Sequence, residues 1–449
     1  MNYQECLSYL RDLGHELRGV HFSLEAITAI LARLGDPHRQ YPTVIVAGTN
    51  GKGSTSAILA SILGAAGYRT GLYTSPHLIR VNERILVGGA EISDADFAAA
   101  FSEVRQAVDG LLAAGALASR PSFFEFLTAA AFLHFARARV DFAVLEVGMG
   151  GRLDATNVTE PRLAVITNVD LDHQEYLGNT RAAIAREKAG VIQPGRPVVA
   201  GRTEAEAIEV IRERCAELGS PLIETSSRGL IQNLRSRQGR YEFDFVLDGD
   251  FFPALVSPLL GRFQVENAAT AITAVCELRR QGFAISPAAV REGVRRASWP
   301  GRLEVAAEHP LVLLDGAHNP AGAREVAAFV REHLATRTLR LVYASMRDKA
   351  IGEISGILFP LAAEIYLTQP NQSRAATPEE MLAAARVDSG RAYSEIDPVK
   401  ALQRAVDASS AEDVVLAAGS LFLVGEIKRA LRQGELTFRG QHEPAAARA

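Results

Sequence analysis

Apolar and polar residues follow two different spacings along this chain, and the spacing predicts which segments form strands and which form helices. Several short, continuous apolar runs end at a glycine or a polar turn, which is typical of strands buried in a parallel sheet. Predicted strands of this kind, with few polar residues, lie at 44–47, 142–148, 163–169 and 197–201, and a further short strand at 68–73 ends in a polar turn. Other segments repeat apolar residues at helical spacing, as Leu7, Leu10 and Leu13 do. We therefore expect an α/β fold in which helices cover both faces of a parallel sheet.

The second half of the chain changes pattern twice. Residues 225–260 contain short alternating segments, which predict a small antiparallel section. Pro300 and Gly301 then mark a domain boundary, because these residue types interrupt regular structure. Beyond it, apolar runs at 311–314, 339–343, 365–368 and 414–418 restart the α/β alternation. The predicted division is an N-terminal domain at 1–298, a smaller C-terminal Rossmann-like α/β domain at 299–436 and a frayed tail at 437–449.

Composition narrows the classes of protein that fit. The chain has 449 residues, enough for two or three domains, and 48% of them are apolar, enough to build their cores. The formal net charge of −4 argues against nucleic-acid and membrane-surface binding. The three cysteines are far apart, and no segment reaches the ~18 apolar residues of a membrane span. We expect a soluble cytoplasmic protein in a reducing compartment.

The most informative motif is a glycine-rich loop between the first predicted buried strand and a predicted helix. Glycines let the backbone curl so that N–H groups point at an anion, and the helix N-terminus adds partial positive charge. A lysine can meet the outer phosphates of ATP, and a hydroxyl can approach a magnesium ion. A glycine-rich turn that binds no phosphate would need neither the lysine nor the hydroxyls. The motif predicts a phosphate site at Gly48, Thr49, Asn50, Gly51, Lys52, Gly53 and Ser54, with shorter spacing than the standard G-x-x-x-x-G-K-[ST] loop.

Polar residues also occur at the ends of other predicted strands. Parallel strands gather their carboxyl ends at one edge of the sheet, where ligands bind. Glu146 lies in a buried strand, so its carboxylate either pairs with an arginine such as Arg152 or binds magnesium. His173 follows another strand and is either a core or capping residue or a magnesium ligand. Ser75 by itself would be interpreted as a turn residue.

Two further positions stay open on the residues alone. Lys188 follows Glu187 in a predicted helix, and composition alone favours a surface residue that pairs with a side chain four positions away. The polar turn at 315–320 closes the first predicted strand of the second domain. It is either a simple strand exit or a site that brings Asp315 to a ribose and His318 to a phosphate.

Taken together, these motifs resemble the folylpolyglutamate synthase and dihydrofolate synthase branch of the Mur ligase family. The matching segments follow one another in order along nearly the whole chain. They are residues 48–54, 75–78, 145–157, 172–173, 187–190, 300–302 and 315–320. The shortened phosphate loop belongs to that family's pattern. One departure is Phe263–Gln264, where the family often has a His–Gln pair, and it leaves one nucleotide contact open.

The resemblance implies roles for individual residues. ATP would be held by the phosphate loop together with Asn267, Arg302, Asp315 and His318. Mg²⁺ would lie among Ser75, Glu146 and His173, and Lys188 would carry a carbamate (N6-carboxylysine) that adds a further ligand oxygen. Lys52, Lys188 and His173 would be the catalytic residues. The pterin-bearing substrate would border Ser122, Phe123, Phe124, Glu125, Arg152, Leu153 and Asp154.

The same resemblance implies a reaction in folate biosynthesis and one-carbon metabolism. The chain would be an ATP-dependent carboxylate–amine ligase that adds L-glutamate to a folate, and also to dihydropteroate, through an acyl phosphate. We expect a monomer that acts on small molecules, without nucleic-acid or membrane partners. Two alternatives remain, a cell-wall amino-acid ligase of the same family and a nucleotide-binding regulator without turnover.

Overall fold

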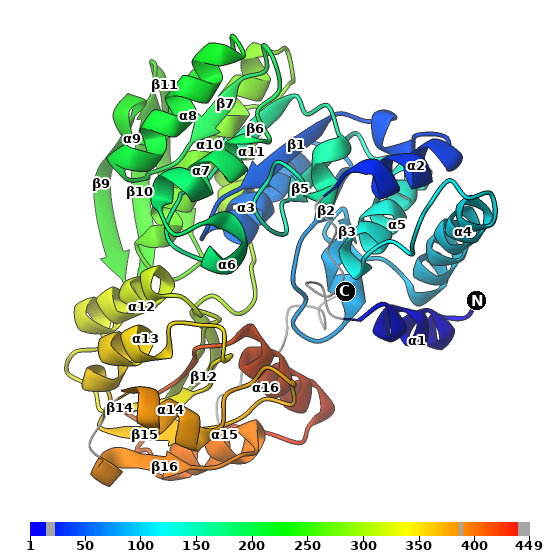
Figure 1. Cartoon of the computed structure of the whole chain (residues 1–449). Helices are drawn as coiled ribbons and strands as arrows, with labels where there is room; N and C mark the ends of the chain where they lie inside the picture. Colours follow the sequence, from blue (N-terminus) through cyan, green and yellow to red (C-terminus); the bar gives the residue numbers. More distant parts are fainter. Residues whose placement is uncertain (15–22, 386–388, 439–449) are drawn as a thin grey trace. The chain divides into compact units, whose positions relative to one another are not determined.

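The computed structural model describes residues 1–14, 23–385 and 389–438, which form two compact units (Figure 1). The first unit contains residues 1–235, 242–258 and 265–298, and the second contains residues 236–241, 259–264 and the chain from 299 onward. The segments 236–241 and 259–264 therefore pack with the second unit, although they precede residue 299 in the chain. The tail predicted at 437–449 lies almost entirely outside the described residues.

An eight-stranded sheet forms the centre of the first unit, in the order β4-β3-β2-β5-β1-β6-β7-β8. Its strands are β1 (Thr43–Ala47), β2 (Thr70–Tyr73), β3 (Ile85–Val87), β4 (Ala90–Glu91), β5 (Phe142–Glu146), β6 (Leu163–Ile166), β7 (Val198–Ala200) and β8 (Leu222–Glu224). The strands from β2 to β8 in this order pair in parallel, whereas β3 and β4 pair antiparallel at one edge. The predicted parallel sheet is confirmed; its edge strand β8 and the antiparallel strands β3 and β4 were not predicted.

Helices cover both faces of this sheet, as every residue of β1 and β5 is buried. The helices are α1 (Tyr3–Leu13), α2 (Glu25–Arg33), α3 (Lys52–Ala65), α4 (Asp94–Ala113), α5 (Phe123–Arg137), α6 (Gln174–Leu177), α7 (Arg181–Ala189), α8 (Ala205–Glu217), α9 (Thr225–Arg228), α10 (Phe263–Arg280) and α11 (Pro287–Arg296). One core cluster joins β5 with α4 and α5, and another joins β6 and β7 with α7 and α8. Within the described residues, no helix has the length and apolar character needed to cross a membrane.

The small strand section predicted at 225–260 is a three-stranded sheet in the order β11-β10-β9. Its strands are β9 (Gly229–Arg237), β10 (Arg240–Leu247) and β11 (Asp250–Ser257). Two residues separate each strand from the next, a connection that only antiparallel strands can make. The antiparallel interpretation is therefore confirmed.

The second unit contains a six-stranded sheet in the order β12-β13-β17-β14-β15-β16. Its strands are β12 (Glu304–Glu308), β13 (Leu311–Leu314), β14 (Leu339–Tyr343), β15 (Glu364–Leu367), β16 (Ala392–Ser394) and β17 (Val414–Ala418). Its helices are α12 (Pro320–His333), α13 (Ile351–Leu358), α14 (Pro378–Ala385), α15 (Pro398–Asp407) and α16 (Leu421–Gln433). All strands except β12 pair in parallel, which confirms an α/β fold; β12 and β16 were not predicted.

Candidate functional site

The glycine-rich loop joins β1 to α3, as the sequence predicts. Gly51 precedes the helix with φ +79°, and a Cβ there would lie 2.4 Å from Oδ1 of Asn267. Gly48 has φ +149°, and a Cβ there would lie 1.9 Å from Oγ1 of Thr167. Both positions therefore require glycine. The structure also brings Asn267, which is far away in sequence, against the start of α3.

Two N–H groups of the loop already have partners inside the protein. The N–H of Thr49 donates to the backbone oxygen of Asn168 at 3.0 Å, and the N–H of Asn50 donates to Oδ1 of Asn168 at 2.8 Å. The first N–H that bonds back within α3 belongs to Thr55, which donates to the oxygen of Gly51. A helix leaves its first N–H groups without intrahelical acceptors. The donors at 51–54 are thus the ones suited to phosphate, whereas Thr49 and Asn50 shape the loop.

Two lysines meet at one carbonyl oxygen of this loop. Lys52 Nζ donates to the oxygens of Gly48 and Thr49, both at 3.1 Å, and Lys188 Nζ donates to the oxygen of Gly48 at 2.8 Å. Lys188 is only 4% exposed, so the interpretation of Lys188 as a surface residue is wrong. Burial, with the charge of Lys52 adding to it, lowers the pKa of Lys188 from 10.5 to about 7. A substantial fraction of this amine is therefore neutral near pH 7.

The residues expected around a metal ion lie on neighbouring elements of the first unit. Glu146 ends β5 and is 4% exposed, and its Oε2 accepts the N–H of Ser75 at 3.1 Å. The two residues meet because β2 and β5 are adjacent parallel strands. Arg152 pairs with Glu187 at 3.0 Å, so the alternative in which Arg152 neutralises Glu146 is not the pairing observed.

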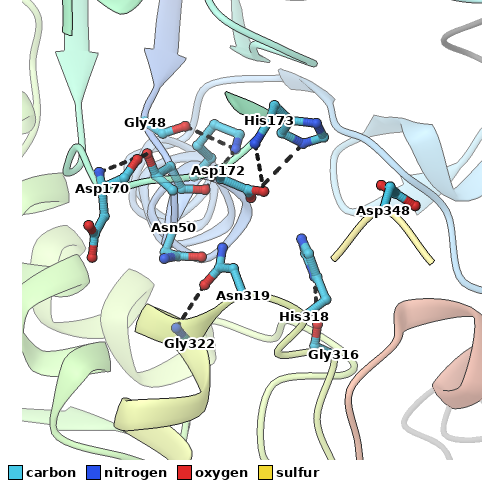
Figure 2. Close-up of polar contacts among 12 residues, drawn as sticks. Gly48, Asn50, Asp170, Asp172, His173, Gly316, His318, Asn319, Gly322 and Asp348 are labelled. Atoms are coloured by element: carbon cyan, nitrogen blue, oxygen red, sulfur yellow. Dashed lines mark hydrogen bonds and ion pairs between the residues drawn. The ribbon is translucent and has the colours of Figure 1, made fainter. Parts of the chain in front are cut away.

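His173 precedes α6 with φ +49°, and its N–H donates to Oδ1 of Asp172 (Figure 2). Its ring Nε2 lies 4.0 Å from Oδ2 of Asp172. Across the described residues, no group of three or more His, Cys, Asp and Glu side chains could hold a metal ion. The expected set relies instead on a serine hydroxyl and a modified lysine. The oxygens of Ser75 and Glu146 suit Mg²⁺, and the imidazole suits it less well.

Several residues that are expected to border the substrate also cap a helix or pack against neighbouring residues. Ser122 and Glu125 form the capping box that begins α5. Phe124 packs on Gly148, where a Cβ would lie 2.7 Å from its ring. Phe123 lies under the guanidinium of Arg84, 5.3 Å from the ring centre.

The remaining three residues of this set follow β5. The carboxylate of Asp154 accepts the N–H groups of Gly148, Met149 and Thr156, and burial raises its pKa. The Arg152 side chain is exposed, and Leu153 is half-buried. The carboxylate of Asp154 therefore holds the turn after β5 together.

Arg302, Asp315 and His318 belong to the second unit, whereas all other predicted site residues belong to the first. The carboxylate of Asp315 accepts the N–H groups of Leu303 at 2.8 Å and Ala317 at 2.7 Å. Burial raises the pKa of Asp315, and the charge of Arg302 opposes that rise. His318 Nδ1 lies 2.8 Å from the oxygen of Gly316 (Figure 2). Asp315 thus organises the turn after β13, as the strand-exit interpretation expects.

Sequence reasoning missed the polar residues directly after β6. Thr167, Asn168 and Asp170 all bond to the phosphate loop, and Asp170 also accepts Nε of Arg181 at 3.0 Å. The strand predicted at 163–169 includes Thr167 and Asn168, whereas β6 ends at Ile166, and the available signal was the polar run that follows Ile166. It could not be used without the strand order, which places β6 next to β1.

Two family models match the chain. The Mur ligase middle domain matches residues 46–275, and the Mur ligase, glutamate ligase domain matches residues 301–421. A Bacillus subtilis protein named dihydrofolate synthase/folylpolyglutamate synthase is 36% identical over 432 residues, 96% of this chain and 99% of that protein. The Escherichia coli protein of the same name is 34% identical over 421 residues, 94% of this chain and 93% of that protein.

Solved structures of proteins with related names are similar to this chain in fold as well as in sequence. Escherichia coli FolC in complex with DHPP and ADP has a TM-score of 0.86 at 32% identity, over 97% of this chain and 99% of that chain. Mycobacterium tuberculosis folylpolyglutamate synthase complexed with ADP has a TM-score of 0.89 at 32% identity, over 98% of this chain and 99% of that chain. The similarity thus extends over both units of the fold.

Proposed function

The chain belongs to the Mur ligase family, within the branch of the folylpolyglutamate and dihydrofolate synthases, and from this premise we propose how its residues join L-glutamate to a folate. It is an ATP-dependent ligase that forms an amide bond. The observation that carries the proposed mechanism is the position of Lys52, whose Nζ donates to the carbonyl oxygens of Gly48 and Thr49 beside the N-terminus of α3. This arrangement places positive charge and N–H donors where the phosphates of ATP would bind.

The proposed reaction has two steps. A carboxylate oxygen of the folate attacks the γ-phosphorus of ATP, the bond to the bridging oxygen breaks, and ADP leaves an acyl phosphate behind. The amine of L-glutamate then attacks the acyl carbon, loses a proton and expels phosphate as the amide forms. Lys52 and the N–H groups of residues 51–54 bind the phosphates and stabilise the charge that develops on them. When bound, Mg²⁺ supplies further positive charge there, and Ser75, Glu146 and His173 would hold it.

Lys188 is the proposed modified residue. Its neutral amine attacks carbon dioxide, an N–C bond forms, and one proton passes to solvent, which leaves a carbamate. The lowered pKa supports this step because only the neutral amine is a nucleophile. The carbamate oxygens would turn a cationic residue into a ligand for a hard cation.

The substrate range is a further part of the proposal. The two relatives whose names carry both activities support the use of dihydropteroate as well as folates, and they favour this branch over the cell-wall ligases. Residues 122–125 and 152–154 would border the pterin-bearing substrate, and Asn267, Arg302, Asp315 and His318 the nucleotide. The division near residue 298, the monomeric state and the cytoplasmic location stay predictions.

The experiment that tests the mechanism removes the charge of Lys52. We expect Lys52→Ala to lower phosphate release by roughly 10²–10³-fold with tetrahydrofolate or dihydropteroate plus L-glutamate, because a preorganised donor to the transferred phosphoryl group is lost. Lys400→Ala, an exposed lysine of α15, is the matched control and should retain full turnover. Unchanged turnover in Lys52→Ala, with the wild-type circular dichroism spectrum, would rule the mechanism out.

A further inference from the structure

The segment after β6, residues 167–170, orients three consecutive peptide groups of the phosphate loop. The backbone oxygen of Asn168 accepts the N–H of Thr49 at 3.0 Å, and its side-chain Oδ1 accepts the N–H of Asn50 at 2.8 Å. The hydroxyl of Thr167 donates to the oxygen of Asn50 at 2.7 Å. These contacts come from a segment about 120 residues away in the chain, and all of them lie within the first unit.

A trans peptide group is planar, so its N–H and its C=O point in opposite directions. A bond that holds one of these two groups therefore aims the other. The bond from the N–H of Thr49 aims the oxygen of Gly48 away from Asn168, and that oxygen receives Lys52 and Lys188. The bond from the N–H of Asn50 aims the oxygen of Thr49 in the same way, and that oxygen receives Lys52.

In the third peptide, between Asn50 and Gly51, the hydrogen bond holds the C=O and therefore aims the N–H. Because the hydroxyl of Thr167 holds the oxygen of Asn50, the N–H of Gly51 points to the other side, at the start of α3. Glycines at 48 and 51, both at positive φ, flank this stretch, so the loop backbone has little conformational resistance of its own to a peptide flip. A flip would present a carbonyl oxygen, in place of an N–H group, to an anion.

We propose that Asn168 is a positioning residue for the nucleotide: its side-chain oxygen fixes the Thr49–Asn50 peptide and thereby holds the ammonium of Lys52 and the loop donors in their phosphate-binding arrangement. The proposal rests on ATP use by this chain. Asn168 acts through Asn50 and Thr49 and does not itself touch the phosphates. Its backbone oxygen survives any substitution, so the side chain is the part that a variant tests.

The test replaces Asn168 with leucine, which has similar volume but no acceptor. We expect Asn168→Leu to raise the KM for ATP and the Kd for ADP roughly five- to tenfold, the value of one hydrogen bond, and to leave the KM for folate and glutamate within twofold. Thr203→Val is the matched control, because Thr203 accepts the N–H of Val169 in the same segment at 3.0 Å. It should leave nucleotide affinity unchanged.

Calorimetry with ADP separates this proposal from the proposed function, because it needs no turnover. Weaker ADP binding in Asn168→Leu alone supports the positioning role, even if the wild type releases no phosphate from ATP. If the wild type turns over and Asn168→Leu binds ADP as tightly as the wild type does, the positioning role is overturned and the ligase function stands. An equal loss of affinity in Thr203→Val would also overturn it, because general loosening of the segment would then explain the effect.

Discussion

At the scale of single residues, the environment of Lys188 decides its chemistry. Composition alone favoured a surface residue, but the side chain is buried and donates to the carbonyl of Gly48. Burial disfavours the charged form of an amine, and the neighbouring charge of Lys52 disfavours it further. The charge of Lys52 also favours a reaction that replaces this positive charge with a negative one, because opposite charges attract. Lys188 is therefore the residue at which electrostatics and the proposed modification agree best.

This agreement predicts a pH-dependent carbamate at Lys188. With carbon-13-labelled bicarbonate and constant dissolved carbon dioxide, a carbamate signal in the NMR spectrum should grow as the pH rises through about 7, because the amine loses its proton there. Lys188→Arg should abolish the signal, since a guanidinium stays protonated. A signal that persists in Lys188→Arg would assign the carbamate to another lysine.

At the scale of elements, the loop needs its glycines because Thr167, directly after β6, and Asn267, in α10, leave no room for a Cβ at Gly48 and Gly51. The β1–α3 connection is a local motif, and the sequence predicts it directly. Its shape, however, depends on the segment after β6, which packs against Gly48 and bonds Thr49 and Asn50. The functional element is thus the loop together with residues 167–170, joined by the pairing of β1 with β6.

This dependence predicts opposite effects for two glycine substitutions in the same strand–helix unit. Gly48→Ala should lower the free energy of unfolding by roughly 1–3 kcal/mol, because its Cβ would meet Thr167 and its φ is unfavourable for alanine. Gly64→Ala, in α3 with open space around it, should raise the free energy of unfolding by about 0.5–1 kcal/mol.

Urea unfolding monitored by circular dichroism measures both effects. Gly48→Ala should also weaken ADP binding, whereas Gly64→Ala should leave ADP binding unchanged. Equal stability changes of the same sign in the two variants would contradict this account of the loop.

At the scale of the whole molecule, two segments that precede residue 299 in the chain pack into the second unit. The core of the second unit contains Leu260, although this residue precedes the predicted boundary near residue 298. Tyr241, at the start of β10, donates its hydroxyl to Glu332 of α12 at 3.0 Å and belongs to the same unit. The C-terminal α/β unit therefore takes part of its core and surface contacts from earlier segments of the chain.

It follows that a substitution at Leu260 should destabilise the second unit. We expect Leu260→Ala to cost about 2–5 kcal/mol there, because a buried side chain is truncated, and to accelerate amide hydrogen exchange in β13 and β14. Leu230→Ala, at a leucine that is 53% exposed, should change stability by less than about 0.5 kcal/mol. Faster exchange confined to the first unit in Leu260→Ala would show that this assignment is wrong.

Local patterns along the chain were enough to identify the central strands, the strand–loop–helix unit at 43–65, the antiparallel section and the α/β class. These features depend on neighbouring residues, because apolar spacing and glycine placement act over a few positions. The short strands β3, β4, β8, β12 and β16, which lie at or next to the edges of their sheets, were missed, since two to five residues carry little periodic signal.

Contacts between segments far apart in the sequence could be identified only from the folded structure. Whether Lys188 is buried, which residues hold the phosphate loop, and to which unit Leu260 belongs all depend on segments far apart in sequence. Asn168 meets Asn50 across 118 positions only because β6 lies beside β1 in the sheet. Strand order is set by the packing of the whole sheet, and no spacing of residues within one segment reports it.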